Sequence, residues 1–106
     1  MKESDIQRAI LDYLAAKRVF AIRMNSGAMF GKHKGKGWAV RFGMKGMADI
    51  LAFPYVDFHI LPTWIEVKMP LASPSAEQCA FGVMVEAEGH RYILARSVDD
   101  VMALMP

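Results

Sequence analysis

Residues 63–68, with the sequence TWIEVK, constrain the fold of this chain more than any other stretch. They are rich in β-branched and aromatic residues, which predicts a strand. Residues two apart in a strand point to the same face, so Ile65 and Val67 would face a core while Glu66 and Lys68 project together from the opposite face. We therefore expect a sheet that carries one carboxylate and one ammonium side by side.

Helical and strand patterns surround this run. Ser4 and Gln7 have the spacing of a capping box, which predicts a helix that runs to about Lys17. A second helix should begin near residues 73–75 and end at Gly89. Further strands are expected at residues 19–22, 38–42, 49–53 and 91–95, and a short final helix is expected after residues 97–100.

This pattern predicts a small mixed α/β sheet flanked by helices, in the order αβββαβ plus a C-terminal helix. A chain of 106 residues with 54% hydrophobic content has apolar material for one core but not for two. We therefore expect a single domain over residues 1–106. The apolar runs are too short to span a membrane, and the N-terminus lacks the pattern of a secretory signal. The single cysteine, Cys79, excludes an internal disulfide and is expected to be a small buried residue, which favours a reducing cytoplasm.

The charge of the chain is divided between its two halves. Residues 1–48 carry ten Lys and Arg against three Asp and Glu, a formal charge of +7. Residues 49–106 carry three against eight, a formal charge of −5. A basic half beside an acidic half suits a protein that attracts a polyanion with one region and holds a cation with the other.

Asp49 lies at the start of the strand that precedes residues 63–68. Pairing of these two strands would bring Asp49 beside Glu66. Two neighbouring carboxylates repel each other unless a cation lies between them. Mg²⁺ suits such oxygen ligands, and it retains sites for water and for a phosphate. The alternative is that Glu66 and Lys68 form an ordinary ion pair on an exposed strand.

The spacing Gly46-x-x-Asp49, followed by Glu66-x-Lys68 and then Gln78, resembles the VRR-NUC branch of the PD-(D/E)XK nucleases. The resemblance covers nearly the whole chain. The other stretches that match the family pattern are Glu3-x-x-Ile6-Gln7, Arg23-x-Asn25-x-Gly27, Lys45-Gly46 and Ser75-x-x-Gln78. Ala48 departs from it, because many members carry proline there, but that position holds no metal. The resemblance implies a restriction-endonuclease-like core.

The resemblance also implies a role for each matching residue. Asp49 and Glu66 would hold the metal, with the Val67 carbonyl as a third ligand. Lys68 would orient or deprotonate the attacking water, a task that suits a compact ammonium. Gln78 would position Lys68 or the water, and Glu3 would join through a metal-bound water or a second metal. Simpler alternatives are that Gln78 only pairs with Ser75 in a capping box, and that Glu3 only favours a helix N-terminus.

Residues 25–37 are rich in glycine and lysine, which predicts a long mobile loop. Glycine lets the backbone approach a phosphate, and lysines release counterions when they contact one. We therefore expect this region, with the nearby Lys45, to contact nucleic acid. The candidate contacts are Asn25, Lys32, His33, Lys34, Lys36 and Lys45.

The function that the resemblance implies is a structure-selective DNA endonuclease that uses Mg²⁺, with Mn²⁺ as a substitute. The phage-type members of the family further imply branched DNA, Holliday-junction resolution and a homodimer, since two symmetric nicks need two active sites. A nuclease that prefers flaps or duplex DNA is an alternative. Two other classes stay open, namely a nuclease-fold module that binds nucleic acid without cutting it, and a small interaction protein whose charges are all solvated.

Overall fold

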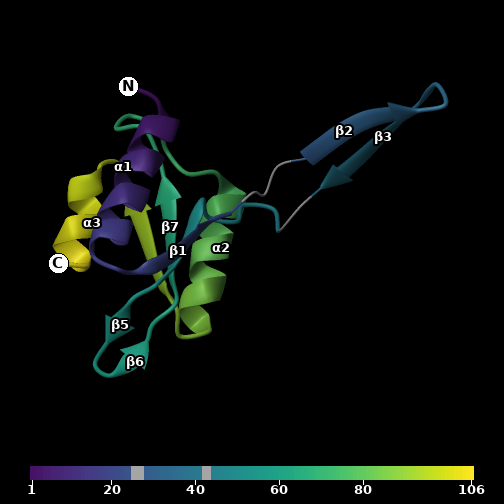
Figure 1. Ribbon diagram of the computed structural model, residues 1–106. Helices are drawn as coiled ribbons and strands as arrows, with labels where there is room; N and C mark the ends of the chain where they lie inside the picture. Colours follow the sequence, from purple (N-terminus) through teal and green to yellow (C-terminus); the bar gives the residue numbers. More distant parts are fainter. Residues whose placement is uncertain (25–27, 42–43) are drawn as a thin grey trace.

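A four-stranded mixed sheet forms the centre of the molecule in a computed structural model of the chain (Figure 1). The structure describes the backbone of residues 1–24, 28–41 and 44–106, and the side chains of residues 1–24, 34–37 and 44–106. The strand order in the sheet is β1-β4-β7-β8. These strands are β1 (Phe20–Arg23), β4 (Ile50–Phe53), β7 (Thr63–Val67) and β8 (Arg91–Ala95).

The sheet is antiparallel at one edge and parallel at the other. β4 pairs antiparallel with both β1 and β7, while β8 runs parallel to β7. A parallel neighbour requires a crossover connection, and the helix α2 (Ala76–Ala87) supplies it. The expected mixed α/β sheet is therefore confirmed, and it contains four of the five predicted strands. The strand predicted at residues 38–42 corresponds to β3 (Lys36–Arg41), which lies outside this sheet.

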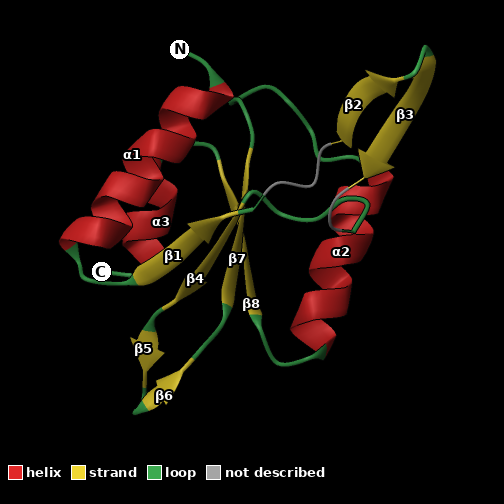
Figure 2. Ribbon diagram, turned by 45° about the vertical axis from the view of Figure 1, so that its right-hand side comes forward, coloured by secondary structure: helices red, strands yellow, loops and turns green. Residues whose placement is uncertain are grey.

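Helices cover both faces of the sheet. α1 (Glu3–Ala16) and α3 (Val98–Leu104) lie on one face, and α2 lies on the other (Figure 2). The main core lies under α1 and α3, and it contains Ile65 and Val67 as the alternation in β7 predicts. Trp64 belongs to a smaller core on the α2 face. Because Glu66 follows Trp64 by two residues, it also faces α2.

The first helix begins differently from the prediction. Lys2 rather than Ser4 is its N-cap, and the Lys2 backbone N–H donates to the Asp5 carboxylate at 2.8 Å. The predicted box of Ser4 and Gln7 is therefore wrong. Asp5 takes the place of the Glu or Gln of a capping box, and its negative charge is favoured at the helix N-terminus.

The predicted long loop over residues 25–37 is also wrong where the structure describes it. β2 (Ala28–His33) and β3 (Lys36–Arg41) form an antiparallel hairpin that projects away from the sheet (Figure 1). Lys34 and Gly35 make its two-residue turn with φ of +51° and +79°. Frequent glycine and lysine hid the strand pattern here, because both residue types are depleted in strands.

A second, shorter hairpin connects β4 to β7. Its strands are β5 (Tyr55–Val56) and β6 (His59–Ile60), and Asp57 and Phe58 form its turn. Within the described residues, no helix has the length and apolar character needed to cross a membrane. Cys79 is exposed on α2, so the expectation that it is buried is wrong.

Candidate active site

Asp49 links the start of β4 to the end of β7. Its Oδ2 accepts a hydrogen bond from the Val67 backbone N–H at 2.7 Å, and its own carbonyl accepts one from the Met24 N–H, also at 2.7 Å. Its neighbours Ala48 and Ile50 are both buried. The Asp49 carboxylate is therefore held at a fixed position beside the Glu66–Val67 peptide, as the strand order predicts.

Glu66 is a buried carboxylate rather than half of an exposed ion pair. Only 2% of its surface is accessible. Its Oε1 accepts a hydrogen bond from the Gln78 side-chain amide at 2.9 Å. Its Oε2 is buried and has no hydrogen-bond partner among the described residues. A buried acceptor without a partner costs free energy, and a cation or a water at this position would remove that cost.

The electrostatic surroundings of Glu66 show which charges gather around it. Burial, and to a smaller extent the negative charge of Asp49, raise the pKa of Glu66 to about 8. Lys68 opposes this shift, while Glu3 adds to it weakly. Thus Glu3 at the start of α1, Asp49 before β4 and Lys68 after β7 all lie within electrostatic reach of one carboxylate.

Gln78 makes contacts of two kinds, one with its capping partner Ser75 and one with Glu66 of the candidate site. Its Oε1 accepts from the Ser75 backbone N–H at 2.8 Å, while its own N–H donates to Ser75 Oγ at 3.2 Å. Its side-chain N–H₂ donates to Glu66. The predicted partner of Gln78 was Lys68 or a water, whereas the contact in the structure is with Glu66. The capping box thus orients the amide that contacts the carboxylate.

Gly46 brings the loop before Asp49 against the first turn of α2. Its φ is +79°, and a Cβ at this position would lie 2.3 Å from the Glu77 carbonyl oxygen. Only glycine allows this approach without displacing backbone atoms. The Gly46 of the motif therefore sets the spacing between Asp49 and the helix that carries Gln78.

Replacing Gly46 with alanine should lower the free energy of unfolding by roughly 2 kcal/mol or more, because strain and overlap with backbone add together. Gly89→Ala is the matched control, since Gly89 has φ +85° and no atom within 4 Å of its Cβ position. That control should cost about 1 kcal/mol. Urea denaturation of both variants measures the difference, and equal losses would contradict the proposed close approach.

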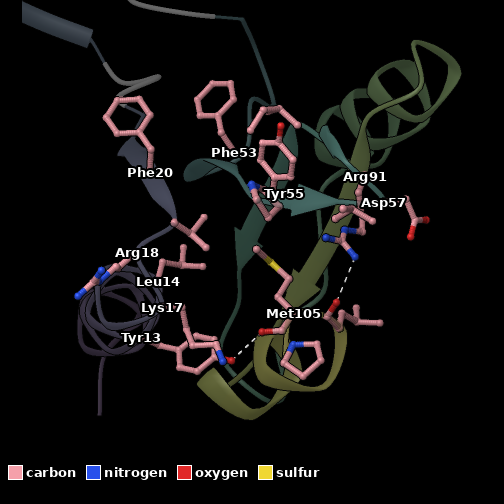
Figure 3. A pocket seen from close by; sticks show the side chains of 16 residues that line it. Tyr13, Leu14, Lys17, Arg18, Phe20, Phe53, Tyr55, Asp57, Arg91 and Met105 are labelled. Carbon is pink, nitrogen blue, oxygen red and sulfur yellow. Dashed lines mark hydrogen bonds between the residues drawn. The ribbon is translucent and has the colours of Figure 1, made fainter.

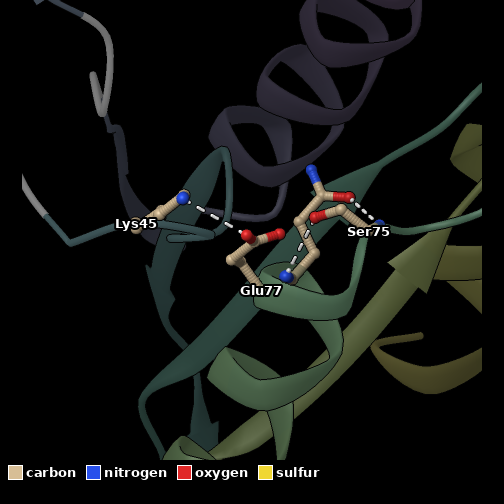
Figure 4. Close-up of polar contacts among 4 residues, drawn as sticks. Lys45, Ser75 and Glu77 are labelled. Atoms are coloured by element: carbon tan, nitrogen blue, oxygen red, sulfur yellow. Dashed lines mark hydrogen bonds and ion pairs between the residues drawn. The ribbon is translucent and has the colours of Figure 1, made fainter.

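The predicted nucleic-acid contacts lie on two elements. Lys34 and Lys36 are exposed at the end of the β2–β3 hairpin, while Lys32 and His33 lie in β2 with side chains outside the described residues. Asn25 also lies outside the described residues. Lys45 forms an exposed ion pair with Glu77 at 3.3 Å, next to the Ser75 cap (Figure 4). An exposed pair of this kind contributes little to stability.

Tyr92 is a neighbour of this site that the sequence patterns did not indicate. It pairs with Trp64 across β7 and β8, and its ring occupies the space that Gly82 leaves on α2, where a Cβ would lie 2.9 Å from the ring. Its hydroxyl is buried without a partner among the described residues. Burial raises the pKa of Tyr92 to about 12, with a smaller contribution from the charge of Glu66. Its sequence neighbourhood carries only a strand pattern, so no local signal separates it from a core tyrosine.

The donor set suits one small oxygen-ligated cation. Within the part of the chain that the structure describes, no cluster of three or more His, Cys, Asp or Glu is placed to hold a metal. The site instead offers Asp49, Glu66 and the backbone around Val67. The unpartnered Oε2 of Glu66 is the observation that fits a cation, and Mg²⁺ commonly uses only one or two carboxylates together with waters. The residues present therefore fit Mg²⁺.

Comparisons of the chain with protein-family models, with curated proteins and with solved structures found no match.

Proposed function

We propose that this protein is a Mg²⁺-dependent endonuclease of the PD-(D/E)XK class, with its active site at Asp49, Glu66 and Lys68. The observation that carries the proposal is the buried Glu66, which has an unpartnered oxygen and lies within electrostatic reach of Asp49 and Lys68. The order of elements around the sheet also supports it, since a helix, three antiparallel strands, a helix and a parallel strand follow the order expected for that fold.

Each group would have a distinct role in hydrolysis. Asp49, Glu66 and the Val67 carbonyl would hold Mg²⁺, which when bound supplies positive charge to a phosphate oxygen and lowers the pKa of water. The Val67 N–H keeps Asp49 in place, and Gln78 keeps Glu66 in place. Lys68 would orient or deprotonate the attacking water and neutralise the charge that develops on the phosphate oxygens. The water oxygen loses a proton and bonds to phosphorus as the bond from phosphorus to the 3′ oxygen breaks. The 3′ oxygen takes up a proton from solvent, which leaves a 5′-phosphate and a 3′-hydroxyl.

The proposed substrate is DNA in the cytoplasm, in a branched form such as a Holliday junction. The exposed lysines of the β2–β3 hairpin support a DNA partner, because the hairpin projects beyond the sheet and would reach phosphates away from the cleavage site. A homodimer would place two active sites on one junction, as paired nicks require.

A cleavage assay on labelled junctions, flaps and linear duplexes with Mg²⁺ tests the proposal, together with a measurement of molecular mass. The wild type should cut at least one branched substrate, while Asp49→Asn should cut none and should lose Mn²⁺ binding by calorimetry. If the wild type neither cuts nor binds Mn²⁺, the nuclease proposal is wrong. If it binds DNA and never cuts it, the protein is a binding module on a nuclease-like fold.

A further inference from the structure

A groove of about 740 Å³ lies away from the candidate active site, between the end of α1, the start of β1 and the β5–β6 hairpin (Figure 3). Aromatic rings line it from three elements. Phe20 and Phe53 stack with ring centroids 5.7 Å apart, and Tyr55 lies beside them. Phe20 is 66% exposed and Tyr55 is 73% exposed, so both rings present surface to solvent.

Positive charge accompanies these rings. The groove is lined by the basic side chains of Lys17, Arg18 and Arg91, and by the acidic side chain of Asp57. Lys17 and Arg18 are exposed, and neither forms an ion pair within the described part of the chain. Arg91 is held by the Leu104 carbonyl at 3.1 Å. Exposed rings next to unpaired cations match the chemistry of bases and phosphates.

Arg18 occupies a backbone position that favours glycine. α1 ends in a Schellman motif, in which the Val19 N–H donates to the Leu14 carbonyl and Arg18 has φ +59°. α2 ends in the same motif, and there the equivalent residue is Gly89 with φ +85°. The chain thus uses glycine at one helix end and keeps a strained arginine at the other.

Phe58 is a second residue with the positive φ that favours glycine, in this case in a turn. The two-residue turn of the β2–β3 hairpin has Gly35 in its second position, with φ +79°. The equivalent position of the β5–β6 turn is Phe58, with φ +68° and 90% of its surface exposed. Neither packing nor turn geometry accounts for an exposed phenylalanine there. Strain that the fold does not require points to a functional use.

We propose that this groove binds an unpaired DNA strand, with bases on its lining residues Phe20 and Tyr55 and phosphates on Lys17 and Arg18. The DNA strand would extend from the groove onto Phe58, the exposed residue that follows Asp57 of the lining. This inference deepens the proposed function and rests on it for the choice of nucleic acid. Phe53 lies four residues along β4 from Asp49, which is about 13 Å in an extended β-strand. A DNA strand that leaves the cleavage site would therefore reach the groove within a few nucleotides. A second copy of the chain, related by a two-fold axis, would place the same excess of positive charge against this groove. Repulsion between the two groups of cations therefore disfavours a second copy as its occupant.

Arg18→Gly and Phe58→Gly test the proposal, because glycine removes each side chain and also relieves its backbone strain. Fluorescence anisotropy with a labelled oligothymidylate of about 12 nucleotides, in EDTA on an Asp49→Asn background, should show about tenfold weaker binding for each variant. Arg18→Gly should also reduce the salt slope of log K by about 0.7, while Phe58→Gly should leave this slope unchanged. Both variants should melt at the same temperature as the parent or higher. Arg8→Ala, which removes an exposed cation of α1 outside the groove, is the control for charge.

Unchanged oligonucleotide affinity in both variants would overturn the proposal, as would equal weakening for a duplex of the same length. A parent dimer that dissociates in Phe58→Gly would overturn it too, since the groove would then be an interface between copies. The binding assay contains no metal and needs no cleavage. The cleavage assay therefore tests the proposed nuclease function, and the binding assay separately tests the proposed role of the groove.

Discussion

Lys68→Ala should abolish DNA cleavage, with a rate loss of about 10²–10⁴-fold, which is the usual contribution of a positioned proton-transfer group. The Lys68 backbone N–H donates to the Ala95 carbonyl at 3.0 Å, and this bond does not involve the side chain. The fold and the positions of Asp49 and Glu66 should therefore survive the substitution. Single-turnover cleavage measures the rate, and circular dichroism checks the fold.

Metal binding separates the role of Lys68 from that of the carboxylates. Because Lys68 opposes the raised pKa of Glu66, its removal should shift Mn²⁺ binding to higher pH without eliminating it. Lys68→Arg keeps the positive charge but holds its proton at any working pH, so it separates charge stabilisation from proton transfer. Arg8→Ala, which removes an exposed cation of α1, should cleave at the parental rate. Cleavage by Lys68→Ala within a few-fold of the parent would rule out the proposed mechanism.

The second large effect concerns stability and pH. The pKa of Glu66 is about 8 in the folded protein against a usual value of 4.5, because burial and Asp49 disfavour its ionised form. Between these two values the unfolded chain binds fewer protons than the folded protein. The free energy of unfolding in EDTA should therefore fall as pH rises from about 4.5 to 8, by up to about 1.4 kcal/mol per pH unit.

Glu66→Gln should remove this dependence, since glutamine is neutral and of nearly the same shape. At pH 9 the variant should be more stable than the parent by a few kcal/mol in EDTA. Added Mn²⁺ should stabilise the parent and leave the variant unchanged. Denaturant titrations at pH 5, 7 and 9 measure both effects. Glu86→Gln, which changes an exposed carboxylate on α2, is the control. Identical pH slopes for the parent and Glu66→Gln would contradict the raised pKa.

The sequence predicts the elements whose signals are local. The apolar alternation of β7, the Ser75–Gln78 capping box and Gly89 after α2 each lie within a few residues, and each appears in the structure at its predicted place. Local signals failed where two readings competed. At the N-terminus Asp5 caps α1 in place of the predicted box, and in residues 28–37 the glycines and lysines concealed β2 and the turn of the hairpin.

The sequence by itself determined which charged groups the sheet carries and in what order, since the period of a strand and the spacing of motifs are properties of neighbouring residues. Only the tertiary structure decided the state of those groups. Glu66 is buried and short of one hydrogen bond because α2 covers it, and α2 comes that close because Gly46 lacks a side chain. Desolvation and electrostatic coupling depend on segments that meet only after folding, so a pattern along the chain contains neither of them.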